Sequence, residues 1–426
     1  MDSKQCFKKS TVGKIPCEWE NAKLIDAVDK LTDGSHFSPK EVKDSKFYIA
    51  TVKDMSQYKI NLNSCKKISE QDYVKLTEAD CKPEKGDVLF SKDGTMGLCF
   101  VYSQQEPIVL LSSIAIIRPN YKLDPYFLKY YLSNASVKEF IVSNHSSGSA
   151  LPRLTLTNLK EIPIIIPALR EQQSIAKILS DLDSKIELNQ KMNKTLESIA
   201  QAIFRHWFID FEFPNEEGKP YKSSGGERVD SELGEIPKGW QVKYFKDIVS
   251  LTMGVSPKGN SYNTDGFGVP LLNGAADFSN GMIEPKKFTT NPVKTCKEDD
   301  LLFCIRATIG NLTYSDREYC IGRGVAALSP INKIFKEYSY FTLEYGLHDL
   351  ISKASGSVIR GLSKNDIFLY KVLVPKDKIM AEFHLLVSSM FSRIRYLKNE
   401  TRSLSALKDS LLPKLMLGKI RVPLEE

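Results

Sequence analysis

Histidine and cysteine are the first residues to examine for chemistry, because their side chains ligate metals and form catalytic triads. The chain has 426 residues, with five histidines and eight cysteines. No two histidines are four residues apart, and no two cysteines form a C-x-x-C pair. These spacings argue against a metal site or a His-based triad. We expect the cysteines to be free thiols in a reducing cytoplasm.

Motifs for nucleotide binding and methyl transfer are absent from the sequence. It has no G-x-x-x-x-G-K-[ST] loop, no G-x-G-x-x-G loop after a predicted strand, and no N-P-P-[YF] tetrapeptide. The first two motifs hold the phosphates of nucleotides, and the third is typical of amino-methyltransferases. We therefore expect no cofactor. A nuclease site built from scattered carboxylates and lysines has loose spacing and stays open.

Turns rich in hydroxyl and basic side chains remain as candidates for binding, and they occur in both halves of the chain. They lie at 91–95 and 304–308, at 147–153 and 355–360, and at 34–36 and 256–258. An ordinary hairpin or loop is the alternative explanation for each of them. Their candidate residues are Ser35, His36, Lys92, Thr95, Ser147, Ser149, Arg153, Lys258, Arg306, Thr308, Ser355, Ser357 and Arg360.

The two halves are related by an internal duplication. The pattern G-x-I-P-x-x-W occurs at 13–19 and 234–240, and D-[VL]-L-F occurs at 87–90 and 300–303. Ser-Gly-Ser follows in each half, and the order of the matches is preserved. The offset drifts from 221 to 208 residues. A repeat of about 210 residues is too long for a solenoid and indicates a whole domain used twice.

Each repeat begins with short apolar strands between turn residues, such as 47–52 and 114–117 in the first and 301–303 and 325–328 in the second. β-branched and aromatic residues between turns favour strands. Short helices are expected at 125–132 and 338–350. The fold class is therefore mixed α/β (α+β), with two similar globular domains and a largely β core.

Each repeat ends in a long helix with a heptad seam. Apolar residues between 175 and 203 are spaced by alternating steps of four and three, and the second copy repeats this from 383 to 411. This pattern predicts that the two helices form an antiparallel coiled coil between the domains. The alternative is that each helix lies on its own domain. Asn189 and Asn193 occupy seam positions, where they either fix the register or face solvent.

These patterns predict the domain organisation. We expect a first globular domain at 1–168, a long helix at 169–212, a polar connector at 213–232, a second globular domain at 233–376, and a second helix with the C-terminal tail at 377–420.

The composition is that of a globular protein. The net charge of +7 is compatible with an anionic partner, although it is modest for this length. No uncharged apolar segment approaches 18 residues, and the N-terminus has no apolar signal region. We expect a cytoplasmic protein without a membrane partner.

The ends of both repeats resemble type I restriction-modification specificity subunits. The resemblance is carried by I-P-I-I-I-P at 162–167, E-Q-Q-S-I-A at 171–176, the helical segment 193–211, and L-L-P-K-L-M-L-G-K-I at 411–420. The segments 13–19 and 234–240 resemble the start of each recognition domain, and 31–36 resembles an early motif within it. The second copy lacks the Glu-Gln-Gln and Trp-Phe matches, so its symmetry with the first is approximate.

The resemblance implies a non-catalytic subunit that reads a two-part site in double-stranded DNA through the major groove. The paired helices would set the gap between the two half-sites and dock two modification (methyltransferase) subunits, and restriction subunits would join that assembly. For a DNA-binding protein, the repeated turns predict that Lys92 and Arg306 meet phosphate or guanine and that Thr95 and Thr308 meet phosphate. In the second pair of turns, small residues would let the backbone approach phosphate, and Arg153 and Arg360 would supply charge.

Two other functions remain possible from the residues alone. One is a single-chain endonuclease or methyltransferase with a fused recognition module, which methylation or cleavage by the pure chain would reveal. The other is a structural adaptor without a DNA role, which a filter-binding test with random duplex DNA would reveal.

Overall fold

The computed structural model describes residues 6–11, 13–94, 96–147, 153–279, 281–356 and 360–423. The chain forms two compact units: unit 1 comprises residues 1–188 and 401–426, and unit 2 comprises residues 189–400. Each unit is a mixed α/β domain, and the two repeat one topology. The predicted fold class and internal duplication are therefore confirmed.

Unit 1 is built on a four-stranded antiparallel sheet in the order β4-β10-β7-β8. Its strands are β4 (Val28–Asp33), β10 (Ile114–Pro119), β7 (Val88–Ser91) and β8 (Cys99–Val101). β7 is buried along its whole length, and the first four residues of β10 are buried as well. Their near-continuous apolar sequence therefore reflects cover on both faces of the sheet.

A second sheet of unit 1 has the order β6-β5-β9, and its β5–β9 pair is parallel. Its strands are β6 (Lys66–Ile68), β5 (Phe47–Ala50) and β9 (Ile108–Leu110), and helix α1 (Glu70–Glu78) follows β6. Two-stranded pairs complete the unit: β1 (Phe7–Ser10) with β2 (Gly13–Pro16), β3 (Glu20–Lys23) with β13 (Pro163–Ile166), and β11 (Ser146–Ser147) with β12 (Arg153–Leu154).

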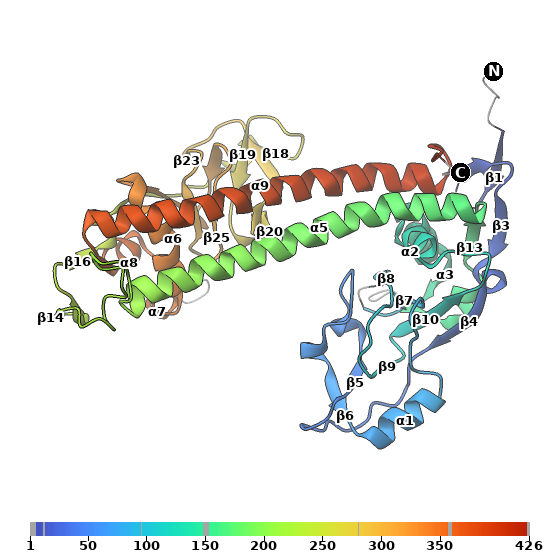
Figure 1. Ribbon diagram of the computed structural model, residues 1–426. Coiled ribbons are helices and arrows are strands. Elements are labelled where there is room, and N and C mark those ends of the chain that lie inside the picture. The colour runs from blue at the N-terminus through green and yellow to red at the C-terminus, as the bar shows by residue number, and fades with distance from the viewer. Residues whose placement is uncertain are drawn as a thin grey trace. The chain divides into compact units, whose positions relative to one another are not determined.

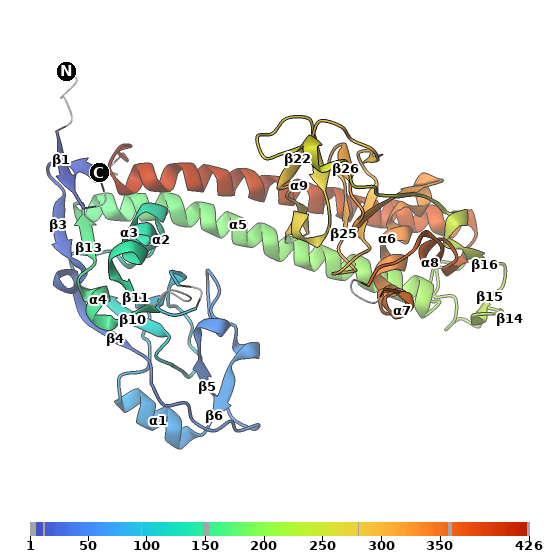
Figure 2. The ribbon, with the colours of Figure 1, turned by 180° about the vertical axis from the view of Figure 1, so that it is seen from behind.

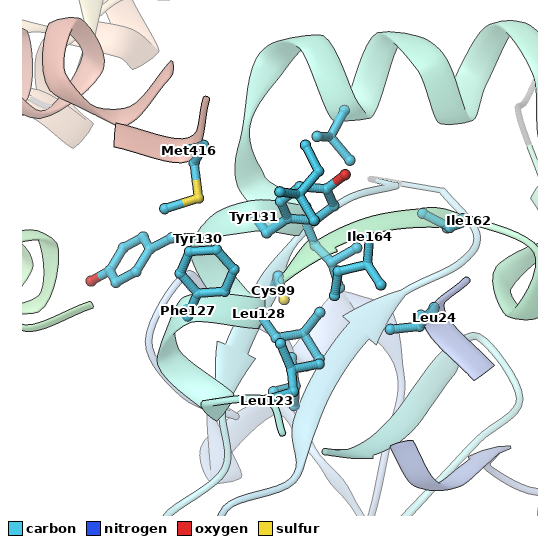
Figure 3. Packing of buried hydrophobic residues seen from close by; sticks show 14 of the residues in the cluster. Leu24, Cys99, Leu123, Phe127, Leu128, Tyr130, Tyr131, Ile162, Ile164 and Met416 are labelled. Carbon is cyan, nitrogen blue, oxygen red and sulfur yellow. The ribbon is translucent and has the colours of Figure 1, made fainter. Parts of the chain in front are cut away.

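Three short helices of unit 1 are α2 (Pro125–Ser133), α3 (Ala135–His145) and α4 (Leu156–Lys160). Asp124 caps α2 by accepting hydrogen bonds from two backbone N–H groups, and proline occupies the first turn. In unit 1, α2 lies between the four-stranded sheet and the long helix α5 (Figure 1). Figure 3 shows Phe127, Tyr130 and Tyr131 projecting from α2 into the main apolar cluster of this unit.

Unit 2 repeats the four-stranded sheet in the order β17-β27-β24-β25. These strands are β17 (Val249–Met253), β27 (Val325–Pro330), β24 (Leu301–Cys304) and β25 (Leu312–Tyr314). Its second sheet, β18-β22-β19-β26-β23, again has one parallel pair, β19 with β26. Its strands are β18 (Tyr262–Asn263), β22 (Lys287–Thr289), β19 (Val269–Leu272), β26 (Tyr319–Ile321) and β23 (Thr295–Cys296).

The remaining strands of unit 2 pair as β14 (Arg228–Ser231) with β15 (Gly234–Pro237), β16 (Gln241–Tyr244) with β28 (Lys371–Val374), and β20 (Phe278–Ser279) with β21 (Met282–Ile283). Its short helices are α6 (Lys336–Tyr345), α7 (Leu347–Lys353) and α8 (Lys364–Phe368). α6 packs against parts of both long helices through an aromatic cluster in which Phe204 contacts Phe341 and Phe383 (Figure 2).

The long helices are α5 (Leu169–Phe204) and α9 (Asp377–Met416), of 36 and 40 residues. At 1.5 Å per residue they are about 54 and 60 Å long. In unit 1, Ile175 and Leu179 of α5 share a core with Leu415 and Met416 of α9. In unit 2, the later part of α5 packs on the earlier part of α9. The two helices therefore pair with each other, as the heptad seam predicts.

Asn189 and Asn193 lie buried in the seam, where they are 0% and 8% exposed. The Asn189 amide donates a hydrogen bond to Glu400 Oε2 at 2.8 Å. The interpretation that these asparagines face solvent is therefore wrong. Buried polar seam residues of this kind fix the register of paired helices at some cost in stability.

The tail that follows α9 returns to the start of unit 1. Arg421 forms ion pairs with Glu18 at 2.5 Å and with Glu171 at 2.7 Å, and Val422 is buried in the unit 1 core. Glu171 Oε2 also accepts a hydrogen bond from the Trp19 indole at 3.0 Å. The last residues of the chain therefore complete the first domain.

The expectation of free thiols is wrong for one pair of cysteines, because Cys6 and Cys17 form a disulfide. They flank the β1–β2 hairpin, and the Cys17 N–H donates to the Cys6 carbonyl at 2.9 Å. The other six cysteines are free. Within the described part of the chain, no helix combines the length and apolar character that a membrane span requires.

Candidate nucleic-acid interface

Unit 2 brings two of the predicted turns together. The Ala307 N–H donates to the Arg360 carbonyl at 3.0 Å, and the Leu362 N–H donates to the Ile305 carbonyl at 2.9 Å. Ser355 and Gly361 exchange backbone hydrogen bonds at 3.1 and 2.9 Å, which closes the second turn. The turns around Arg306 and Arg360, 54 residues apart in sequence, therefore form one surface.

Two further loops join this surface. The Ile305 N–H donates to the Gly324 carbonyl at 2.9 Å, which places the 322–324 turn beside the 305–308 loop. The Arg323 N–H donates to the Ser256 hydroxyl at 3.3 Å, and this bond attaches the loop that carries Lys258. We call the segments 254–258, 305–308, 322–324, 355–356 and 360–361 the unit 2 loop surface.

The unit 2 loop surface is basic. Arg306, Arg323, Arg360 and Lys258 are all exposed, and none of them forms an ion pair with any residue that the structure describes. Thr308 and Ser355 are exposed beside them. Exposed guanidinium groups without an ion-pair partner can donate hydrogen bonds to phosphate oxygens or to guanine edges. The sequence comparison missed Arg323, because the turn at 322–324 belongs to none of the matched segments.

Unit 1 builds the same backbone frame. The Lys92 N–H donates to the Ser113 carbonyl at 2.9 Å, and the Leu154 N–H donates to the Lys92 carbonyl at 3.1 Å. The Ser35 N–H donates to the Leu110 carbonyl at 2.8 Å, as the Val255 N–H donates to that of Ile321 at 2.9 Å. We call the corresponding segments 34–38, 92–94, 111–113, 147 and 153–154 the unit 1 loop surface.

This hydrogen-bond register shows which loop residues of the two units correspond, and it agrees with the offsets in the sequence. Lys92 occupies the place of Ile305, so Asp93 corresponds to Arg306. Arg153 occupies the place of Gly361, one residue after Arg360. The two loop surfaces have the same backbone hydrogen-bond arrangement, but their charged residues lie at different positions.

The charges of the unit 1 loop surface are largely paired within the protein. Lys92 is 5% exposed and forms an ion pair with Asp33. The Arg153 Nε lies 3.3 Å from Asp93 Oδ1. Arg153 stays exposed despite this pair, and His36 is exposed as well, 3.9 Å from Asp33.

The Ser35 hydroxyl is also used inside the protein, because it bonds to the backbone of Phe37 as donor at 2.8 Å and as acceptor at 3.0 Å. Ser35 and Lys92 thus shape their loops. Thr95, Ser149 and Ser357 lie outside the described residues. Ser147 is described only through its backbone, which pairs with Arg153 in the β11–β12 ladder.

A pocket of about 380 Å³ includes residues of the unit 1 loop surface. The Lys66 ammonium there donates to the Ser38 hydroxyl at 3.3 Å and to the Pro39 carbonyl. The pocket is lined by Ser38, Ile49, Thr51, Lys53, Asp54, Ser64, Lys66 and Leu111. Among the described residues, no group of three histidine, cysteine or acidic side chains is placed to hold a metal ion.

Comparison with known proteins identifies the family. The family model described as type I restriction modification DNA specificity domain matches residues 16–198 and 237–384. The chain belongs to this family. Both matches fall on the repeats, so the specificity domain occurs twice.

Relatives extend over almost the whole chain. A Methanocaldococcus jannaschii protein named as the MjaX specificity subunit of a type I restriction enzyme is 29% identical over 432 residues, covering 98% of this chain and 97% of that protein. The HindI specificity subunit of Haemophilus influenzae is 24% identical and covers 79% of this chain and 87% of its own length. As its relatives are named specificity subunits, this chain is a specificity subunit and not a catalytic one.

A solved structure shows the same fold. The type I restriction-modification S subunit of M. genitalium superposes with a TM-score of 0.60 over 93% of this chain and 96% of that one, at 16% identity.

Proposed function

We propose that each loop surface of this specificity subunit reads one half of a two-part site in double-stranded DNA. The observation that carries the proposal is one backbone frame built twice with different side chains. The same backbone arrangement in both units is consistent with both of them binding DNA. Different side chains on that arrangement are consistent with each unit recognising a different base sequence. The unpaired arginines of unit 2 supply the positive charge that phosphates require.

The proposed contacts follow from exposure. His36, Arg153, Lys258, Arg306, Thr308, Ser355 and Arg360 are exposed on the two loop surfaces. Thr95, Ser147, Ser149 and Ser357 stay predicted contacts in the same loops. Ser35 and Lys92 would support these contacts by holding the loops in shape.

We further propose that two modification subunits dock on the long helices, with restriction subunits joining the assembly in the cytoplasm. Support comes from exposed apolar residues that the duplication repeats with an offset of 208. Unit 1 presents Ile178, Leu188 and Leu407, and unit 2 presents Leu386, Tyr396 and Ile199 at the equivalent positions. Two equivalent apolar surfaces fit two copies of one partner. We call these residues the repeated apolar set.

Selection from a random duplex library tests the DNA-reading role. The full chain, together with its modification subunit, should enrich duplexes that carry two short motifs with a constant gap between them. The modification subunit alone serves as the control and should enrich nothing. Recovery of unrelated sequences by the complex would contradict the proposal.

A further inference from the structure

We infer that Asn273 and Arg323 read base edges in the unit 2 half-site, and that Ser112 does so in unit 1, where Thr51 holds the backbone position of Asn273. The inference rests on the proposed function and adds the residues that determine specificity. Neither pair lies in the turns that the sequence matches.

The equivalence of the positions comes from backbone pairing. In unit 2, parallel strands β19 and β26 pair Leu272 with Ile321, and the Gly322 N–H donates to the Leu272 carbonyl at 2.8 Å. In unit 1, β5 and β9 pair Ala50 with Leu110, and the Leu111 N–H donates to the Ala50 carbonyl at 2.9 Å. Asn273 and Thr51 are each the next residue along the first strand.

Arg323 and Ser112 follow the second strand of each pair. Gly322 is the first residue after β26, and Leu111 is the first residue after β9. Arg323 and Ser112 are therefore the second residues of the two turns. The Ser112 N–H donates to the Ser35 carbonyl at 2.9 Å, while the Arg323 N–H donates to the Ser256 hydroxyl at 3.3 Å. The turn after β9 is therefore held against the 34–38 loop, and the turn after β26 is held against the 254–258 loop.

Glycines on both sides of Arg323 let Asn273 approach this turn closely. A Cβ on Gly322 would lie 2.4 Å from Asn273 Oδ1, and a Cβ on Gly324 would lie 2.1 Å from the Asn273 carbonyl. Any larger residue would push Asn273 away. The Gly-Arg-Gly turn therefore lies against Asn273, and the exposed Arg323 stands between the two glycines that make this contact.

Both side chains are available for a ligand. Asn273 is held by its backbone, whose N–H donates to Asp277 Oδ2 at 2.7 Å, whereas its amide group has no hydrogen-bond partner among the described residues. Arg323 is exposed and has no acidic partner in the same set of residues. Arg306 and Arg360 flank the pair on the same surface.

The chemistry of the pair suits base recognition. Arginine bonds the O6 and N7 atoms of guanine through two N–H groups, and asparagine bonds N6 and N7 of adenine. Ser112 carries a hydroxyl, which selects bases less strictly. The Thr51 hydroxyl is used within its own loop, where it donates to Asp54 Oδ2 at 2.9 Å and accepts from the Lys53 N–H at 3.2 Å. We therefore expect Arg323 to contact a guanine, and we expect a weaker preference for guanine in the half-site that unit 1 binds.

The experiment uses the full chain in complex with its modification subunit, and it compares Arg323→Ser and Asn273→Thr with the unaltered protein. These variants introduce the residues of unit 1. Lys333→Ser is the control, because Lys333 is exposed and follows the opposite end of β27 from the 322–324 turn. Circular dichroism and melting confirm that each variant folds.

Selection from a random duplex library should show a change in one half-site only. Arg323→Ser should lower the preference for guanine at one position by about 5- to 150-fold, the range for one good bidentate contact. The other half-site and the gap should stay unchanged, as should every position for Lys333→Ser. The reciprocal variant Ser112→Arg should alter only the other half-site.

The outcomes separate the two proposals. If the unaltered complex selects no sequence, the proposed function fails. If it selects a split site while Arg323→Ser weakens all sequences equally, Arg323 contacts only phosphate and this inference is overturned. An unchanged preference in both variants overturns it as well.

Discussion

Arg360 lies on a turn whose backbone carbonyl accepts a hydrogen bond from Ala307. Its exposed side chain is therefore presented by a fixed backbone. Residues of this kind contact the phosphate backbone and position a protein on a duplex without reading its sequence.

Arg360→Ala should weaken DNA binding by a similar factor for all sequences and reduce the slope of log affinity against log salt by about one. The loss of one phosphate contact releases one fewer counterion, which is the physical reason. Fluorescence anisotropy at several salt concentrations measures both effects. Lys333→Ala, which removes an equal charge elsewhere on unit 2, should leave the slope unchanged.

Sequence comparison located some of the proposed interface residues and missed others for a physical reason. Arg306 and Arg360 lie in turns that both repeats share, so the duplication exposed them. Asn273 and Arg323 lie at strand ends that come together only through the parallel β19–β26 pair. The burial of Lys92 against Asp33 is equally invisible in the sequence, because the two residues lie on different strands or loops 59 positions apart.

At the scale of the element, the pairing of the long helices in unit 1 contains a buried charge cluster. Asp183 is 4% exposed and forms ion pairs with Lys129 and Lys408, both at 2.7 Å. The Tyr130 hydroxyl also donates to it at 2.8 Å. Burial acts to raise the pKa of Asp183, but the two lysines outweigh burial and hold this pKa below 3.8.

Asp183→Asn should destabilise the protein by about 3–5 kcal/mol, because it leaves two lysines of the cluster without their counter-charge. Urea unfolding at pH 7 measures this loss. Asp181→Asn is the matched control: Asp181 pairs with Lys177 on the exposed face of the same helix, where its side chain is 66% exposed. That change should cost less than about 1 kcal/mol.

The same cluster predicts a dependence on pH. A carboxylate whose pKa is lowered on folding stabilises the protein above its unfolded pKa, and this stability is lost as the pH falls through the folded pKa. The difference in stability between the unaltered protein and Asp183→Asn should therefore shrink as the pH falls below 3.8. A difference that is constant down to pH 2 would contradict this role.

The heptad pattern predicted both helices and their pairing, since period and seam are local properties of the sequence. The partners of Asp183 were not predictable in this way. Lys129 comes from α2, and Lys408 lies 225 residues further along the chain. The duplication places Phe391 and Ala200 at the positions of Asp183 and Lys408, so symmetry gave no indication of a charge cluster.

At the scale of the whole molecule, the duplication governs how partners can bind. Leu188 and Tyr396 occupy equivalent positions in the repeated apolar set and are 50% and 55% exposed. Each belongs to a different unit, so each should serve a different copy of the partner.

Leu188→Asp and Tyr396→Asp should each remove one modification subunit from the complex, because a carboxylate in an apolar interface is costly to desolvate. The double variant should bind none. Mass photometry of the assembled complex counts the bound subunits. Ile331→Asp, which alters an apolar residue that is 64% exposed outside the long helices, should retain both.

The closure of unit 1 by the tail has a consequence for biosynthesis. Leu415, Met416 and Val422 belong to the core of the first domain, and Arg421 neutralises Glu171 beneath Trp19. A ribosome must therefore translate the second domain before the first can finish its interior. Chains stopped before residue 401 would leave apolar surface of the first domain uncovered, so a nonsense mutation late in the second domain should damage the first domain as well.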